Sequence, residues 1–193
     1  MPRKVMLLGD SIRMSYQDLV AAALAPGPVW GPAENCQYSL YTLSSLGRWL
    51  AAFAEACDGP PDVVHWNNGI HDVGHNPSRA PVQMPIEVYA GNLGFIGRQL
   101  LDSGARVVFA TSTPVHPERP FLGDRWSWRN DEIDAYNARA RQVMADLQIP
   151  VNDLHGLVAA DPDGLLSADQ LHLSEAGKKA CAAAVVEVVE GHG

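Results

Sequence analysis

Short apolar segments alternate along the chain with longer segments whose apolar residues recur at helical spacing. The short segments have the length and the continuous apolar character of strands that are buried on both faces. The predicted strands are Val5–Leu8, Asp62–Trp66, Arg106–Ala110 and Ile149–Val151, with a short edge strand at Val29–Trp30. Regular alternation of strands and helices predicts a parallel sheet that is covered by helices on both faces.

The longer segments predict five helices, and turn and capping residues mark several of their ends. Pro26-Gly27-Pro28 follows the first helix, Gly104 is the expected C-cap of the third, and Ser174 is the expected N-cap of the last. The predicted helices are Tyr16–Leu24, Tyr41–Ala56, Pro85–Ser103, Asn130–Leu147 and a final helix through Val189. No repeat or linker interrupts this order, so we expect a single domain over residues 1–193.

The first candidate for chemistry, Gly9-Asp10-Ser11-Ile12, directly follows the first predicted strand. Parallel sheets bind ligands at the carboxyl ends of their strands. A serine there lies beside the start of the next helix, where backbone N–H groups and the helix dipole can stabilise an oxyanion. The alternative is a structural Ser/Asp cap in a tight turn. The Gly-x-Ser-x-Gly elbow of another hydrolase fold does not fit, because Arg13 stands at its second glycine.

The second candidate is Asp169, which precedes His172 by three residues, shortly before the last predicted helix. A carboxylate at this spacing can accept the Nδ1–H of the imidazole and leave Nε2 free to take a proton from a hydroxyl. The spacing is common and weak by itself. In a doubly wound sheet, however, Ser11 can reach the same edge as this pair, and the three residues together predict a Ser-His-Asp triad.

In these motifs the chain resembles the SGNH (GDSL-type) hydrolases over nearly its whole length. The resemblance implies that Ser11 is the nucleophile, that its own N–H serves the oxyanion hole, and that Asp169 and His172 complete the triad. It also implies a three-layer α/β/α sandwich with a parallel sheet of about five strands, as in flavodoxin-like proteins. The family's third block, Gly-x-Asn-Asp, corresponds here to Gly69-Ile70-His71-Asp72, in which His71 replaces the asparagine. The variant string Asn-Asn-Gly-Ile-His-Asp looks like that of a bacterial subgroup.

The other donors of the oxyanion hole stay open at the level of sequence. A neutral imidazole N–H of His71 can donate to an oxyanion, and so can the amides of Asn67 or Asn68. In the family a glycine after the second strand supplies a backbone N–H, but the corresponding segment here, Glu34–Ser39, contains no glycine. The backbone of Asn35 or Cys36 could substitute. Because buried amides need partners, the polar string after the middle strand favours a site over a core.

The resemblance implies a serine esterase that works through an acyl-enzyme, with no cofactor and no metal. The expected substrate is a small-molecule ester, with a short acyl group such as acetyl on a hydrophilic or carbohydrate alcohol, while lipids and thioesters stay open. Trp126 and Trp128 lie in the Pro-rich segment Pro114–Asn130, which we expect to overhang the site. They would either contact a sugar ring or acyl chain or anchor the loop to the core.

Two other interpretations stay open. The missing glycine and asparagine of the family's blocks would suit an inactive binding or scaffold domain. A metal-dependent hydrolase is the second alternative, although Gly74 and Pro77 break any helix that would align the histidines. Its ligands would be His71, Asp72 and His75, with His65 or His116 in addition.

Composition and charge narrow the class of partner. Among 193 residues, 47% are hydrophobic and 19% are charged, which excludes a mainly disordered chain. The 22 acidic residues outnumber the 14 basic ones to give a net charge of −8, and the basic residues do not cluster. We therefore expect no nucleic-acid partner. Cys36, Cys57 and Cys181 lack metal-ligand spacing and are expected to be reduced.

The apolar runs of the chain are short, which bears on membrane spans and on signal peptides. No run approaches the ~20 residues that span a bilayer, so we expect no membrane association. The run Val5–Leu8 near the N-terminus is too short for the apolar region of a signal peptide. We therefore expect a cytoplasmic protein, or a secreted one if a leader has been removed from the sequence.

Overall fold

One parallel sheet organises the computed structural model, which describes residues 2–119 and 125–191. Its strands lie in the order β2-β1-β3-β4-β5, and every neighbouring pair is parallel. β2 lies on one side of β1, and β3, the next strand in the sequence, lies on the other. The strand order therefore reverses at β1, where such sheets bind ligands. The strands are β1 Val5–Leu8, β2 Val29–Trp30, β3 Val63–Asn67, β4 Arg106–Ala110 and β5 Val151–Asn152. The predicted fold class is confirmed.

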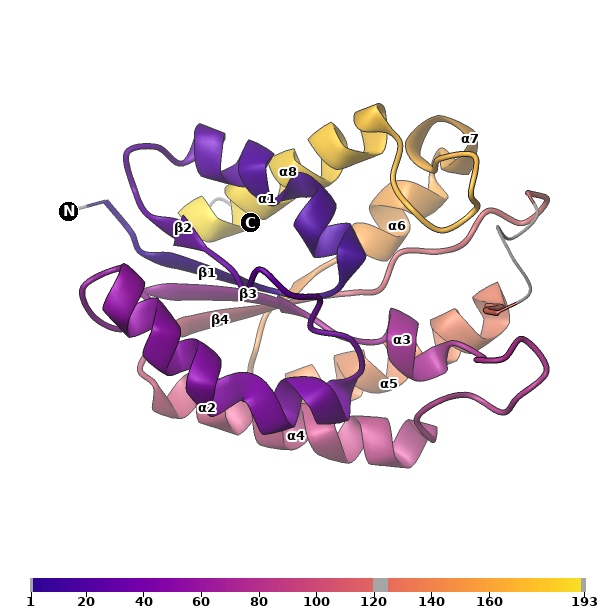
Figure 1. The fold of residues 1–193 in the computed structure, drawn as a ribbon, viewed down its shortest axis with the longest axis horizontal. Coiled ribbons are helices and arrows are strands. Elements are labelled where there is room, and N and C mark those ends of the chain that lie inside the picture. The colour runs from indigo at the N-terminus through magenta and orange to yellow at the C-terminus, as the bar shows by residue number, and fades with distance from the viewer. Residues whose placement is uncertain (1, 120–124, 192–193) are drawn as a thin grey trace.

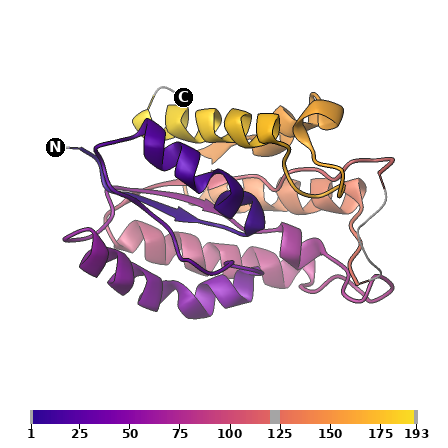
Figure 2. The same ribbon diagram turned by 45° about the horizontal axis from the view of Figure 1, so that its top comes forward.

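Helices cover both faces of this sheet (Figure 1). The helices are α1 Ser11–Ala23, α2 Ser39–Ala56, α3 Ile70–Val73, α4 Ile86–Asp102, α5 Asn130–Asp146, α6 Leu154–Ala159, α7 Pro162–Leu165 and α8 Glu175–Glu190. α1 and α8 pack together on one face, whereas α2, α4 and α5 form the layer on the other, as Figure 2 also shows. None of the helices in the described residues is long and apolar enough to cross a membrane.

Alternate residues of β1 belong to different cores. Met6 and Leu8 pack in the core beneath α2, α4 and α5, while Val5 and Leu7 pack in the core beneath α1 and α8. Successive side chains of a strand point to opposite faces, so a strand between two helical layers is apolar throughout. This is the physical reason that the continuous apolar runs predicted the strands correctly.

The first helix begins five residues before its predicted start at Tyr16. Asp10 caps α1, because its carboxylate accepts the N–H of Ile12 at 2.8 Å. The apolar periodicity did not reveal this first turn because it contains Arg13, a charged side chain that is nevertheless buried. Sequence patterns also missed the short helices α3, α6 and α7.

The last strand begins two residues later than predicted and ends one residue later. Pro150 has no N–H for the ladder, and its carbonyl accepts from Phe109, so the described pairing with β4 covers Val151 and Asn152. The predicted edge strand at Val29–Trp30 is confirmed, as is Ser174 as the N-cap of α8.

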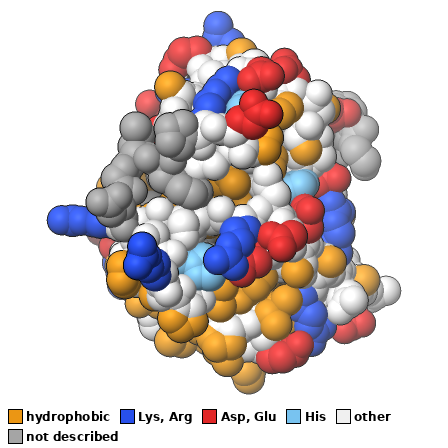
Figure 3. Space-filling model, turned by 90° about the vertical axis from the view of Figure 1, so that its right-hand side faces the viewer, with side chains coloured by type: hydrophobic (Ala, Val, Ile, Leu, Met, Phe, Trp, Pro, Cys, Tyr) orange, Lys and Arg blue, Asp and Glu red, His pale blue; other side chains and the backbone are white. Residues whose placement is uncertain are grey.

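The carboxyl ends of the strands face one end of the molecule, at the right of Figure 1. Figure 3 looks onto this end and shows acidic, basic and hydrophobic side chains interspersed, with histidines among them. The segment 114–130, which we expected to overhang the site, lies at this end of the molecule in its described parts. Residues 120–124 of the segment lie outside the described residues.

Candidate active site

Ser11 is the first residue of α1 and follows the end of β1 by a two-residue turn. The first N–H groups of a helix have no intrahelical acceptor, and they create a partial positive charge there. The Ser11 hydroxyl is thus placed at the carboxyl edge of the sheet and beside a helix N-terminus. This is the position that the sequence predicted for it.

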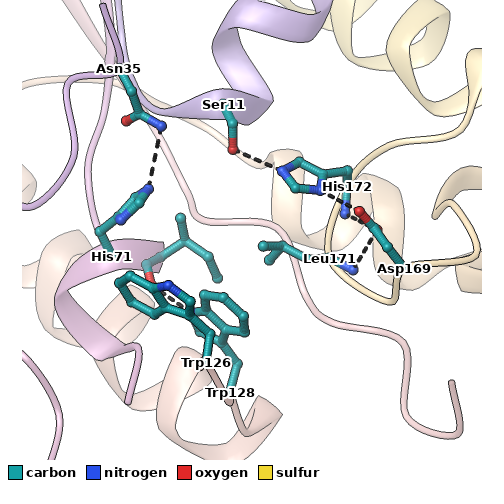
Figure 4. Close-up of a pocket in the computed structure, with 9 residues that line it drawn as sticks. Ser11, Asn35, His71, Trp126, Trp128, Asp169, Leu171 and His172 are labelled. Atoms are coloured by element: carbon teal, nitrogen blue, oxygen red, sulfur yellow. Dashed lines mark hydrogen bonds and ion pairs between the residues drawn. The ribbon is translucent and has the colours of Figure 1, made fainter. Parts of the chain in front are cut away.

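His172 and Asp169 approach Ser11 from the loop that precedes α8 (Figure 4). The Nε2 atom of His172 lies 3.1 Å from the Ser11 hydroxyl, and its Nδ1 atom lies 2.5 Å from Oδ2 of Asp169. Because a carboxylate accepts the Nδ1 proton, the Nε2 lone pair is left facing the serine. The arrangement can therefore remove the hydroxyl proton of Ser11.

Asp169 stays ionised in this arrangement. Partial burial acts to raise its pKa, but hydrogen bonds from Ser167 and from the side chain and backbone of His172 outweigh burial and lower the pKa to about 2. The donors include the Ser167 hydroxyl at 2.6 Å and the backbone N–H groups of Leu171 and His172. A carboxylate held in this way fixes the imidazole tautomer and can stabilise an imidazolium.

The loop that carries this pair is fastened to the segment after β4. The backbone N–H of His116 donates to the carbonyl of Gln170, and the Gln170 amide donates back to the His116 carbonyl. Arg119 donates to the carbonyls of Leu166 and Ser167 at 2.7 and 2.9 Å. Sequence reasoning missed these supports, because nothing in a lone glutamine or arginine indicates a backbone carbonyl from a distant loop.

A pocket of about 410 Å³ opens beside the serine. Polar side chains surround Ser11, and apolar side chains form the opposite wall (Figure 4). The lining residues are Ser11, Asn35, Ile70, His71, Trp126, Trp128, Asp169, Leu171 and His172. The structure therefore brings together the predicted triad, two of the candidate oxyanion residues and both tryptophans.

The other three candidate oxyanion residues do not line this pocket. The Asn67 amide donates to the carbonyl of Ala110, and both hydrogens of the Asn68 amide are directed to acceptors in the loop before α2 and in α2 itself. Cys36 is buried, and its backbone N–H donates to the carbonyl of Gly9 at 3.2 Å. The Asn67 amide thus joins the ends of β3 and β4, and the other two groups join the segments that follow β1, β2 and β3.

Asn35, from the loop that follows β2, and His71, from α3, lie beside one another at the pocket. The Asn35 amide nitrogen lies 3.5 Å from Nε2 of His71. Burial lowers the pKa of His71, with Asp10 acting to raise it and His172 acting to lower it further. His71 is therefore neutral at ordinary pH and carries one ring proton.

Arg13 holds the loop of Asn35 against the turn of Ser11. Its buried guanidinium donates to the carbonyls of Gly9, Pro32 and Glu34 and to the side chain of Gln17. The carbonyl of Glu34 immediately precedes Asn35, so Arg13 sets the distance between the two loops. In the sequence, Arg13 stands out only as a departure from the Gly-x-Ser-x-Gly motif of another hydrolase fold.

The two tryptophans form the apolar wall as a stacked pair. Their ring centroids are 5.3 Å apart and their planes differ by 2°. The Trp128 indole N–H donates to the carbonyl of Ile70 at 2.7 Å, and Trp126 meets His71 edge to face. A side chain at Gly74 would collide with both indoles. The pair is thus anchored to the loop after β3 and also exposed to the pocket.

The residues considered as metal ligands have separate partners. Asp72 accepts from Ser39, His75 contacts Glu132 and the carbonyl of Ala80, and His116 contacts Asp163. His65 is buried near Asn152. No cluster of three or more metal-ligating side chains occurs within residues 2–119 and 125–191.

Comparison with models of protein families shows which family the chain belongs to. The model of the GDSL-like lipase/acylhydrolase family matches residues 7–180, which is most of the chain. The chain belongs to this family. As a GDSL-like lipase/acylhydrolase it is a hydrolase of ester bonds, and the resemblance inferred from its motifs is confirmed.

Solved structures share the same fold with this GDSL-like hydrolase at low sequence identity. An acetyl xylan esterase is 18% identical with a TM-score of 0.78, and the match covers 96% of this chain and 99% of that one. The lipase/acylhydrolase of Enterococcus faecalis is 22% identical with a TM-score of 0.77, covering 98% and 96%. The acetylxylan esterase of Geobacillus stearothermophilus is 15% identical with a TM-score of 0.70, covering 96% and 93%. Comparison with curated proteins found no match.

Proposed function

We propose that this chain, as one domain over residues 1–193, is a serine esterase in which Ser11, His172 and Asp169 form the catalytic triad. The observation that carries the proposal is the hydrogen-bonded line from the Ser11 hydroxyl through His172 to an ionised Asp169. Its position at the wall of a pocket makes the serine accessible to a small ester.

The reaction proceeds in two stages. Nε2 of His172 takes the proton of Ser11 as Oγ attacks the ester carbonyl, and the negative charge that develops on the carbonyl oxygen is stabilised by N–H donors. The imidazolium then gives its proton to the departing alkoxide, so that an alcohol leaves and an acyl-serine remains. Water, deprotonated by His172, attacks the acyl-serine, and Ser11 regains its proton as the acid departs.

The oxyanion hole is formed by the Ser11 N–H together with a donor from the pair Asn35 and His71. These two side chains line the pocket beside Ser11, whereas the amides of Asn67 and Asn68 are engaged in the packing between strands and loops. One such donor contributes on the order of 10²–10³-fold to kcat in hydrolases of this type.

The proposed substrate is a short acyl ester, acetyl above all, of a hydrophilic or carbohydrate alcohol. A pocket of about 410 Å³ with four polar side chains besides Ser11 suits a small acyl group and a hydroxylated leaving group better than a long chain. The acetylxylan esterases that share the fold support this choice.

Replacement of the triad residues tests the function. Ser11→Ala and His172→Ala should each lower kcat/KM for p-nitrophenyl acetate by at least ~10³-fold, because both act on the same proton transfer. Circular dichroism should show that both variants are folded. Near-wild-type turnover in either folded variant would contradict the proposal.

Labelling by a fluorophosphonate probe separates an esterase from an inactive scaffold of the same fold. Only a serine activated by a neighbouring base reacts rapidly with such a probe. We expect wild-type protein to be labelled at Ser11 and the Ser11→Ala variant to stay unlabelled. Activity on a panel of acetylated sugars and of esters with graded acyl length would then assign the substrate.

A further inference from the structure

The side-chain amide of Asn35 has a defined orientation. Its oxygen Oδ1 accepts the backbone N–H of Gln37 at 2.7 Å, in a turn where Gln37 has a φ of 52°. An inverted amide would set two donors against each other at this short distance. The NH₂ group must therefore point the other way, toward the pocket and toward Nε2 of His71 (Figure 4).

This orientation fixes the tautomer of His71. An amide NH₂ can only donate, so Nε2 of His71 must be the acceptor of the contact at 3.5 Å. A neutral imidazole that accepts at Nε2 carries its proton on Nδ1. His71 therefore has no proton on the ring nitrogen that faces Asn35, and this nitrogen cannot donate to an oxyanion.

The neighbouring donors are already engaged. The N–H groups of Cys36 and Gln37 donate to the Gly9 carbonyl and to Asn35 itself, and the Asn68 amide donates to the Gln37 carbonyl and to Thr42. One hydrogen of the Asn35 amide is directed at His71. Among the described residues no acceptor is recorded for its second hydrogen, and Asn35 lines the same pocket as Ser11.

We infer that the Asn35 side-chain amide is the second donor of the oxyanion hole, beside the Ser11 N–H, and that His71 is a positioning residue that orients this amide as an acceptor. The amide donor, which relatives of this family carry at the place of His71, has thus moved to the loop after β2. Arg13 supports this arrangement because it holds the Glu34 carbonyl next to Asn35. The inference rests on the proposed function and names the donor within it.

Two substitutions at Asn35 test the donor. Asn35→Asp keeps the oxygen that accepts the Gln37 N–H, and so keeps the turn, but it replaces the amide donor with negative charge. Asn35→Ala removes both. We expect kcat for p-nitrophenyl acetate to fall by at least ~10²-fold in both variants, with KM changed by less than ~3-fold, because an oxyanion forms only after binding.

The oxyanion itself can be probed with 1,1,1-trifluoroacetone. Addition of the Ser11 oxygen to this ketone forms a hemiketal, the serine proton passes to His172, and the former carbonyl oxygen becomes the oxyanion. The inhibition constant should rise by at least ~10-fold relative to the wild type in Asn35→Ala, which removes the donor without adding a charge. A donor elsewhere would leave this constant unchanged.

The role of His71 is tested by its tautomer and by rescue. In ¹⁵N-resolved NMR of the wild-type protein, Nε2 of His71 should have the shift of an unprotonated ring nitrogen and Nδ1 that of a protonated one. His71→Ala should lower kcat by about 10-fold. His71→Gln should recover part of that loss, because its side-chain oxygen can accept from Asn35 although it cannot titrate.

The outcomes separate this inference from the proposed function. If Ser11→Ala is inactive while either Asn35 variant retains kcat within ~10-fold of the wild type, the donor assignment is wrong and the triad stands. A proton on Nε2 of His71 would also overturn it and make His71 the donor. If Ser11→Ala is fully active, the proposed function itself fails, whatever the Asn35 variants do.

Discussion

Asp72 lies beneath the site, where it caps a helix that has no cap of its own. The side chain of Tyr38, the residue before α2, makes no capping hydrogen bond. Asp72 of α3 instead accepts both the N–H and the hydroxyl of Ser39. Burial raises the pKa of Asp72 to about 7, although the hydrogen bonds from Ser39 act to lower it. A carboxyl group that protonates near neutrality thus joins α3, which carries His71, to α2.

The raised pKa of Asp72 makes stability depend on pH. Between about pH 4 and pH 7 the folded state holds a proton that the unfolded chain releases, so the free energy of unfolding falls as pH rises through this window. Asp72→Asn removes this dependence. From pH 5 to pH 8 we expect the stability of the variant relative to the wild type to rise by about 2 kcal/mol.

Urea denaturation of both proteins at the two pH values measures this difference. Taking the variant against the wild type cancels the contribution of every other titrating group. Parallel stability–pH curves for the two proteins would show that Asp72 has the same pKa in the folded and unfolded states.

The contact between α7 and α8 sets the position of the catalytic loop. The loop of Asp169 and His172 leaves α7 at Leu165 and enters α8 at Ser174, whose N–H donates to the Leu165 carbonyl at 2.9 Å. Gly177, in the first turn of α8, lies so close that a Cβ atom there would collide with the same carbonyl. The two helices can approach this closely only because the residue is glycine.

A matched pair of glycine substitutions tests this contact. Gly177→Ala should lower the free energy of unfolding by about 1–3 kcal/mol, because the new methyl group pushes α8 away from α7. It should also lower kcat, because the loop of His172 is displaced. Gly47→Ala in α2 is the control, since its Cβ would meet open space. That variant should gain about 0.5–1 kcal/mol from helix propensity.

Thermal and urea denaturation, together with kcat for p-nitrophenyl acetate, provide the readouts for the glycine pair. Equal stabilisation of both variants would mean that α7 and α8 can separate at no cost. The contact between α7 and α8 would then not set the position of the loop that carries His172.

At the scale of the whole molecule, the site is an assembly of loops from both halves of the chain. Ser11 follows β1, Asn35 follows β2, His71 follows β3, and His172 precedes α8. Trp126 closes the pocket from the segment before α5 and is bound to the loop after β3 through paired hydrogen bonds between Ser127 and His75. The apolar wall therefore depends on two segments that are remote in sequence.

Replacement of Trp126 distinguishes substrate binding from loop anchoring. If the indole that lines the pocket contacts a sugar ring, Trp126→Ala should lower kcat/KM for an acetylated monosaccharide by about 10-fold, the loss of one aromatic contact. The same variant should change kcat/KM for p-nitrophenyl acetate by less than 3-fold. Trp128→Phe is the structural control, because it loses the hydrogen bond to Ile70 and should affect both substrates alike. Equal losses with both substrates in Trp126→Ala would assign this indole to anchoring alone.

Sequence patterns determined the layers, most strands and the family, because each depends on local regularities. Continuous apolar runs predicted strands buried on both faces, and Ser174 revealed the cap of α8. The start of α1 was missed because Arg13 is charged and nevertheless buried. The carbonyls of Pro32 and Glu34, which accept hydrogen bonds from its guanidinium, come from another loop. Such partners are not visible in the local pattern.

In the candidate site, too, one part could be predicted from the sequence and another part only from the structure. The order of Ser11, Asp169 and His172 along the chain was enough to predict that they meet at one edge of a doubly wound sheet. The sequence alone left five residues as equal candidates for the oxyanion hole. Only the tertiary structure decided which of them face the pocket, because the orientation of an amide or an imidazole depends on the acceptors and donors that distant segments place around it.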